Sequence, residues 1–148
     1  RKDWGGVIPD STLQRLVAVA GLKRGSAQAR ISGMRDISIP FEAAKKVFHK
    51  RTMPRFTRMS QKAFPSMEKL HPHSQGALVS LVFNRGAAMA GKRRRHMRYI
   101  REAIIQASPN KVPQFFRDMK VIWAGSGLDG LLRRRDDEAN LFQLGLSS

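Results

Sequence analysis

The fold is decided by one apolar stretch, Gln75-Gly76-Ala77-Leu78-Val79-Ser80-Leu81-Val82-Phe83-Asn84-Arg85-Gly86. As a helix it would be apolar on nearly every face, and such a helix has no side to turn to solvent. It is therefore predicted to be a central buried helix over about residues 74–84. Gly86 follows it and can adopt the left-handed conformation that ends a helix.

The segments before this stretch are also predicted to be helical. Asp10 can cap a helix that ends at Gly21, a short helix follows near residues 27–34, and another begins after Ser38. Pro54 is expected to break that last helix, because proline has no amide hydrogen and clashes with the preceding turn. No segment alternates apolar and polar residues for long enough to predict a strand.

Three more helices are expected after Gly91. The first is amphipathic and places Met97, Ile100 and Ile104 on one face. The second points these side chains inward: Phe115, Phe116, Met119, Ile122 and Trp123. The third spans residues 128–142 and has this buried stripe: Leu128, Leu131, Leu132 and Phe142. The sequence thus predicts one compact all-α domain over residues 1–148.

Composition restricts the chemistry that the chain can perform. Its 148 residues contain no cysteine, which excludes disulfides, a thiolate nucleophile and cysteine-type zinc sites. The longest apolar run is much shorter than the roughly 20 residues of a membrane span. Pro72 sets a turn between His71 and His73 and no acidic third ligand lies nearby, so we expect neither a metal site nor a cofactor.

The charge is strongly positive, at +17, and it is unevenly spread. Residues 41–102 hold 15 basic and 3 acidic side chains, a net charge of +12. A field of this sign predicts a polyanionic partner. The densest run, Lys92-Arg93-Arg94-Arg95, begins a helix, where cations oppose the helix dipole, so we assign these four residues to binding an anionic surface.

The central stretch resembles the core helix of phage-type lysozymes and their bacteriocin and effector-toxin relatives. A second element, Gly130-Leu131-Leu132-Arg133-Arg134-Arg135-Asp136-Asp137-Glu138, is similar to a helix near the end of those lysozymes. Phe64-Pro65 and the segment 113–120 fit the same order, so the resemblance covers roughly residues 3–142. It implies that the chain is a helical lobe of a lysozyme, with Asn84, Arg85, Arg134 and Arg135 lining a glycan cleft.

The catalytic part of that family has no visible match. The family places a Glu at the end of an N-terminal helix, followed by a Gly-rich hairpin with a second acidic residue. The four glutamates here, Glu42, Glu68, Glu102 and Glu138, precede no such hairpin and are expected to be surface or ion-paired helix residues. No catalytic residue is therefore assigned, and the chain is expected to lack the catalytic hairpin.

By this resemblance the intact protein is a peptidoglycan-degrading N-acetylmuramidase that cleaves the β-1,4 bond between N-acetylmuramic acid and N-acetylglucosamine. An endolysin, bacteriocin or secreted antibacterial effector is expected, made in a bacterial or phage-infected cytoplasm and acting in the periplasm or cell wall. Its partner would be peptidoglycan or the anionic envelope, and an immunity protein is a candidate partner. Two alternatives stay open: a non-catalytic cationic wall-binding lobe, and a cationic helical module for nucleic acid. The few aromatic residues, mostly on buried faces, do not favour the second.

Overall fold

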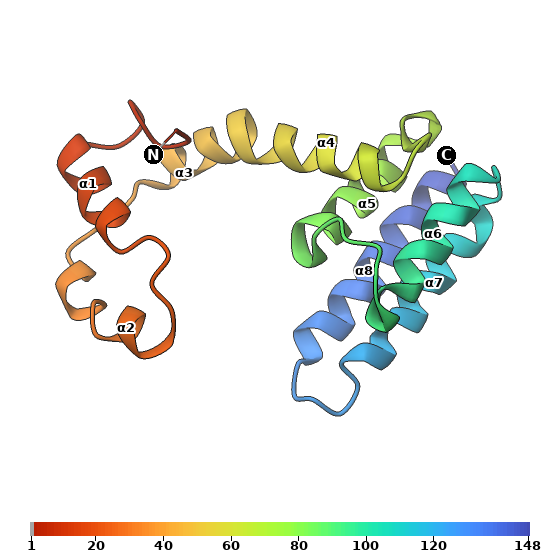
Figure 1. Ribbon diagram of the computed structural model, residues 1–148. Coiled ribbons are helices and arrows are strands. Elements are labelled where there is room, and N and C mark those ends of the chain that lie inside the picture. Colours follow the sequence, from red (N-terminus) through yellow and green to blue (C-terminus); the bar gives the residue numbers. More distant parts are fainter. Residues whose placement is uncertain (1) are drawn as a thin grey trace. The chain divides into compact units, whose positions relative to one another are not determined.

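A computed structural model describes residues 2–148, and Figure 1 shows their arrangement as helices joined by loops and short turns. No strand occurs in this part of the chain, which confirms the all-α prediction. The chain divides into two compact units, residues 1–55 and 56–148. The single domain expected over residues 1–148 stays a prediction, and each unit is described here by itself.

The first unit contains α1 (Asp10–Ala18), α2 (Arg24–Gln28), a 3-10 turn (Ser32–Met34) and α3 (Phe41–Val47). Its buried apolar side chains are Ile8, Leu13 and Val47. A polar clamp adds to this small core: Arg15 of α1 donates to both carboxylate oxygens of Asp36, at 2.6 and 2.7 Å, and to the carbonyl of Gly33. The clamp ties α1 to the loop after the 3-10 turn.

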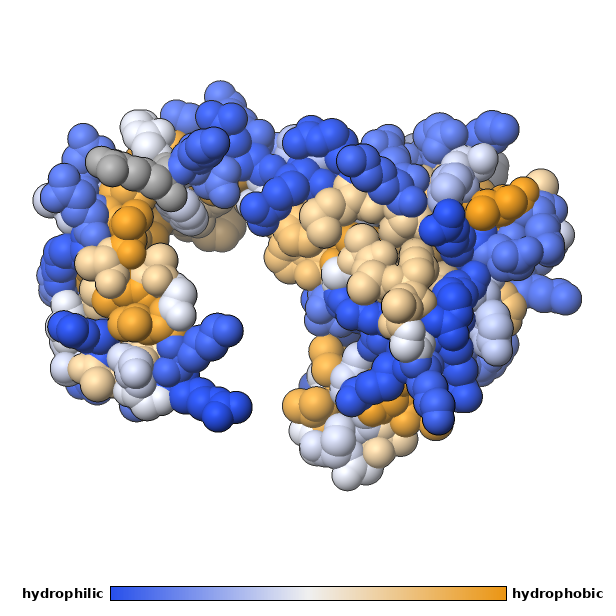
Figure 2. Space-filling model, viewed as in Figure 1, coloured by the Kyte–Doolittle hydropathy of each residue, from blue (hydrophilic) through white to orange (hydrophobic). Residues whose placement is uncertain are grey.

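The expected break at Pro54 is wrong. From α3 the chain runs through a π-helical turn (Phe48–Thr52) directly into α4 (Met53–Ala63). The amide of Met53 donates to the carbonyl of Phe48, five residues earlier. This wider turn makes room for the proline ring and needs no amide hydrogen from Pro54, so the helix continues. Figure 2 shows hydrophilic residues along the outer side of α4, where Arg58 and Lys62 are exposed.

The second unit is built around α5 (Pro72–Arg85) and α8 (Asp129–Leu146), with α6 (Arg95–Ile105) and α7 (Val112–Asp118) completing it. α5 packs on α8, α8 on α7, and α7 on α6. The prediction of a central buried helix is confirmed, since four side chains of α5 are fully buried: Ala77, Leu78, Leu81 and Val82. Gly86 follows its last residue with a φ of 74°, a positive value that favours glycine, but its ψ of 173° differs from the left-handed helical conformation that was expected.

α5 and α8 approach each other closely at one end. The hydroxyl of Ser74 donates to the carbonyl of Phe142 at 3.0 Å. A Cβ added at Gly145 would collide with Ser74, so glycine is required there by the contact between the two helices. α6 behaves as predicted, because Met97, Ile100 and Ile104 are all buried.

Two expectations about the core are wrong. Phe83 is 45% exposed, so it is not a core residue. Its ring centroid lies 4.8 Å from that of Phe56. Leu128, which precedes the first residue of α8, is 48% exposed. The buried face of this helix is instead formed by Arg135, Glu138, Ala139 and Phe142. α8 therefore turns an ion pair toward α5, and Leu131 and Leu132 are only half-buried.

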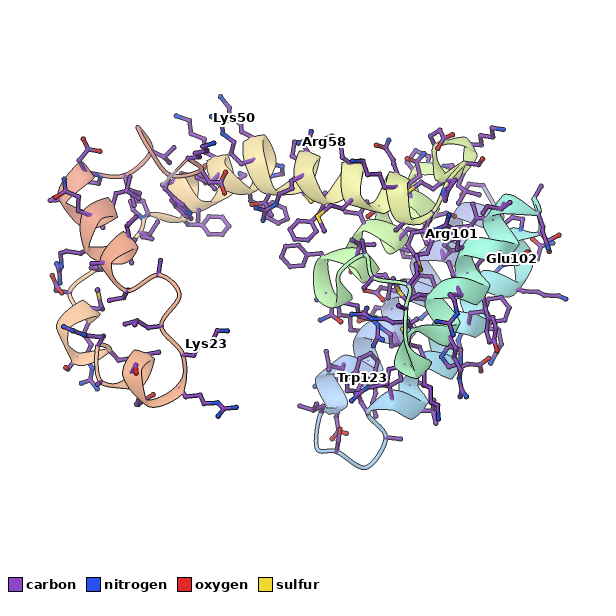
Figure 3. All side chains as sticks on the ribbon, viewed as in Figure 1. Lys23, Lys50, Arg58, Arg101, Glu102 and Trp123 are labelled. Atoms are coloured by element: carbon purple, nitrogen blue, oxygen red, sulfur yellow. The ribbon has the colours of Figure 1, made fainter. Side chains whose placement is uncertain are left out.

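Between α7 and α8 the chain passes through a 3-10 turn, η6 (Met119–Ile122), that ends at Trp123. Phe116, Met119 and Trp123 are buried, as predicted, whereas Phe115 and Ile122 are half-buried. Figure 3 shows Trp123 at this end of the second unit. None of the helices described is both long and apolar enough to cross a bilayer.

Candidate functional site

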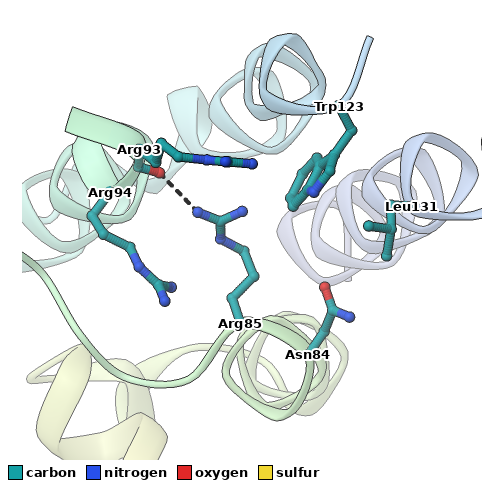
Figure 4. Close-up of a pocket in the computed structure, with 6 residues that line it drawn as sticks. All are labelled: Asn84, Arg85, Arg93, Arg94, Trp123 and Leu131. Carbon is teal, nitrogen blue, oxygen red and sulfur yellow. Dashed lines mark hydrogen bonds between the residues drawn. The ribbon is translucent and has the colours of Figure 1, made fainter. Parts of the chain in front are cut away.

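The second unit contains a pocket of about 350 Å³ where the C-terminal end of α5 meets the turn before α6, the end of η6 and the first turn of α8. Figure 4 shows the side chains that line it: Asn84, Arg85, Arg93, Arg94, Trp123 and Leu131. No acidic side chain is among these six. The wall is therefore a mixture of cations, one amide and apolar surface.

Arg85 is the central side chain of this pocket. Its Nη2 donates to the carbonyl oxygen of Arg93 at 2.7 Å, which fixes the guanidinium across the pocket. The guanidinium carbon lies 4.7 Å from the ring centroid of Trp123, a cation–π distance. Burial, together with the nearby charges of Arg94, Arg135 and Arg93, lowers the pKa of Arg85 to about 10, and Glu138 opposes the shift.

Several of these guanidinium groups have donors without a partner. Arg85 Nε, Arg94 Nη1 and Arg135 Nε are buried, and none has a hydrogen-bond partner within residues 2–148. A buried donor that forms no hydrogen bond carries a desolvation cost. The pocket thus combines excess positive charge with unused donors.

A buried ionic network lies behind the pocket and connects α8 to α5. Arg135 is fully buried and Glu138 is only 3% exposed. Glu138 Oε1 accepts from Ser80 Oγ at 2.6 Å, from Arg135 Nη2 at 2.8 Å and from Arg134 Nε at 3.1 Å. Arg135 Nη2 also lies 3.3 Å from Asn84 Oδ1, which links the network to the pocket wall.

Glu138 was expected to be a surface or ion-paired helix residue, and it is an ion-paired residue that is buried. Its partners are Arg134, whose side chain is 35% exposed, and Arg135, whose side chain is 0% exposed. The hydroxyl of Ser80 in α5 donates to Glu138 and accepts from Arg134 Nη2 at 2.9 Å. The spacing of charges along one helix cannot show that another helix covers them.

The four glutamates lie on separate elements within the part of the chain that the structure describes. Glu42, Glu68 and Glu102 are exposed on separate elements. Burial raises the pKa of Glu138, and the charge of Arg135 and the Ser80 hydroxyl oppose that rise. Its Oε1 already accepts three hydrogen bonds, and Oε2 lies 2.7 Å from Arg135 Nη2 without hydrogen-bond geometry. A carboxyl held in this way positions Arg134 and Arg135.

The eight predicted binding residues fall into three groups. Asn84, Arg85, Arg93 and Arg94 line the pocket. Arg134 and Arg135 belong to the network behind it. Lys92 and Arg95 are exposed outside the pocket lining. The basic run 92–95 is therefore divided, since its two middle members turn into the pocket.

Trp123 is one of two pocket residues, with Leu131, that the sequence pattern assigned only to the core. Its helical spacing with Phe116 and Met119 predicted only a core position, and it is indeed buried, yet one face stacks on Arg85. The His71–Pro72–His73 turn caps α5, because the amide of His73 donates to His71 Nδ1 at 3.3 Å. Within residues 2–148, no group of three or more His, Asp or Glu side chains is placed to hold a metal ion.

The comparisons with known proteins give one finding. Residues 11–138 match the family model described as phage lysozyme. No curated protein and no solved structure gives a significant match. The match covers most of the chain, including α5, the pocket and the Arg134–Glu138 segment of α8.

Proposed function

The chain belongs to the phage lysozyme family, and on that premise we propose that it is part of a peptidoglycan-degrading lysozyme. The proposed reaction is hydrolysis of the β-1,4 bond between N-acetylmuramic acid and N-acetylglucosamine. The family match over residues 11–138 is the observation that carries this proposal. An antibacterial toxin or an endolysin that acts in the periplasm or cell wall is the setting that we infer.

The second unit would supply one wall of the glycan-binding cleft. Asn84 and Arg85 lie on the pocket surface, where an amide and a guanidinium can hydrogen-bond to the hydroxyl and acetamido groups of a glycan. Trp123 adds an apolar face of the kind that stacks against a sugar ring. Arg135 would hold Asn84 in place through its 3.3 Å contact, and Glu138 would hold Arg135.

Hydrolysis of a glycosidic bond needs a carboxylic acid as proton donor and a second carboxylate across the bond. Glu138 is enclosed by its donors, and the other three glutamates lie on the surface. We therefore propose that the acid and its partner carboxylate come from outside residues 1–148. In this arrangement the role of the present chain is to bind and orient the glycan.

The test uses the protein isolated from its natural source and purified sacculi. Products are reduced with borohydride and hydrolysed, and the amino-sugar alcohols are identified by mass spectrometry. The proposal expects muramitol, because cleavage after N-acetylmuramic acid leaves that sugar at the reducing end. Glucosaminitol alone would indicate cleavage of the other glycosidic bond, and no new reducing end would rule out a glycosidase.

A second role follows from charge. Residues 41–102 carry a net +12, and exposed cations such as Lys50, Arg58 and Arg95 belong to this segment. We propose that they attach the protein electrostatically to the anionic cell envelope. Clustered exposed cations raise the local concentration of a polyanionic substrate and its rate of association.

A further inference from the structure

The pocket is lined by three arginines and by no acidic side chain. Arg85, Arg93 and Arg94 line it, and Arg135 lies directly behind. The buried carboxylate near them, Glu138, already accepts from Ser80, Arg134 and Arg135. Among residues 2–148, no carboxylate forms an ion pair with the three arginines that line the pocket.

The unused donors of the pocket indicate what would fill it. Arg85 Nε and Arg94 Nη1 are buried without a partner within the described residues. Guanidinium groups recognise planar or tetrahedral oxyanions through paired N–H donors, and these charge-assisted hydrogen bonds are among the strongest in proteins. One oxyanion in the pocket would pair with the guanidinium groups of Arg85 and Arg94 and reduce their mutual repulsion.

The position of Arg85 is fixed before any ligand arrives. Its bond to the carbonyl of Arg93 and its stacking on Trp123 hold the guanidinium in place. The indole also removes water from one side of the site, and a lower local dielectric strengthens an ionic contact. Figure 4 shows Arg93 and Arg94 on either side of Arg85, with Trp123 beyond it.

We propose that this pocket binds a single oxyanion, a phosphate or carboxylate group, through Arg85 and Arg94. The inference deepens the proposed function at the same pocket, and it rests on that function only for the source of the anion. If the ligand is a glycan of the cell wall, the group would be a carboxylate of its peptide stem. If it is a phosphate, the group would come from envelope phosphates or from solution.

The test measures binding of small anions to the whole 148-residue chain. In a Trp4→Phe background Trp123 is the remaining tryptophan, so its fluorescence reports on the pocket. Inorganic phosphate and acetate are titrated separately at constant ionic strength, with chloride as the compensating anion. We expect a saturable change for at least one of them, together with a rise in the thermal midpoint, because a ligand that binds only the folded state stabilises it.

Arg94→Gln is the main variant, because the Arg94 side chain makes no hydrogen bond within residues 2–148 that its loss would break. It should raise the dissociation constant of the anion about tenfold or more, as the loss of one charge-assisted hydrogen bond does. Arg133→Gln removes the same charge from an exposed position of α8 outside the pocket lining and is the matched control, with an expected change below about twofold.

The results separate this proposal from the proposed hydrolysis, because neither readout needs turnover. Saturation by phosphate alone or by acetate alone supports the site and identifies its group. Equal weakening by Arg94→Gln and Arg133→Gln would show that the net charge binds the anion and that there is no defined site. Absence of saturation by both anions would also overturn the inference, whatever the hydrolysis assay shows.

Discussion

Replacing Glu138 by Gln should cost more stability than any other single charge removal in this chain. The carboxylate is 3% exposed and is the counter-ion of Arg135, which is fully buried. Removing one member of a buried ion pair leaves the other charge uncompensated, at a cost of about 3–5 kcal/mol. The Gln oxygen can still accept from Arg135, so the lower end, about 3 kcal/mol, is expected.

The assay is urea and thermal unfolding of the whole chain, followed by circular dichroism. A loss of about 3 kcal/mol corresponds to a fall of at least about 12 °C in the midpoint of a unit of this size. Glu102→Gln is the matched control, because Glu102 is exposed on α6 and its carboxylate accepts a hydrogen bond from Gln106, the residue after this helix (Figure 3). It should stay within about 0.5 kcal/mol of the parent chain.

A third variant tests the mechanism. In the double variant Arg135→Met with Glu138→Leu, both buried charges are replaced by apolar side chains of similar volume, which is often neutral. It should therefore unfold at a higher midpoint than Glu138→Gln alone. Equal midpoints for Glu138→Gln and Glu102→Gln would refute the reasoning, because the burial of the pair would then have no energetic consequence.

Three further predictions concern the core, acid sensitivity and the basic surface. Leu81→Ala should lower the free energy of unfolding by about 2–5 kcal/mol in urea melts, as expected for a fully buried leucine. Phe83→Ala should lower it less, because that ring is 45% exposed, and the reverse order would contradict the packing of α5. Burial, with the charge of Arg95 added, lowers the pKa of His96 from its ordinary value of 6.5, and Asp118 opposes the shift. Because the unfolded chain then binds more protons below pH 6.5, the free energy of unfolding should fall on acidification from pH 7.5 to 5.5. His96→Asn should reduce this dependence of stability on pH. An unchanged dependence would exclude His96 as its cause. Reversing Arg93, Arg94 and Arg95 to Glu should remove most binding to purified sacculi, and high salt should do the same to the parent chain, since exposed charges are screened within about 8–10 Å near physiological ionic strength. Pull-downs at low and high salt would measure this, with duplex DNA as the comparison; tight DNA binding without sacculus binding would favour a nucleic-acid module.

The sequence predicted those parts of the fold that depend on local pattern. α5 has no polar face wide enough for solvent, so its burial follows from the residues themselves. The Met97–Ile100–Ile104 face of α6 is likewise set by helical spacing. The π-helical turn before Pro54 was not predictable in this way, because it depends on one wide hydrogen bond that overrides the usual effect of proline.

The candidate site was predictable only in part. Asn84 and Arg85 were selected by resemblance, and they do line the pocket. Arg135 and Glu138 are buried where α8 meets α5, and Glu138 accepts a hydrogen bond from Ser80, which lies 58 residues before it in the sequence. The spacing of Arg and Glu along a helix is the same for exposed and buried pairs, so it could not predict this burial. Trp123 is buried in the core and also contacts Arg85 in the pocket. A hydrophobic pattern predicts the burial but not the pocket contact.

The most direct test of the central claim is the release of reducing ends from purified sacculi by residues 1–148 alone. The claim is that this chain is the glycan-binding part of a lysozyme and that its four glutamates do not supply the catalytic acid. The account predicts binding to the sacculi and a release of reducing ends no greater than that of a heat-inactivated sample. Turnover well above that control would contradict it, because a catalytic acid would then lie within these 148 residues.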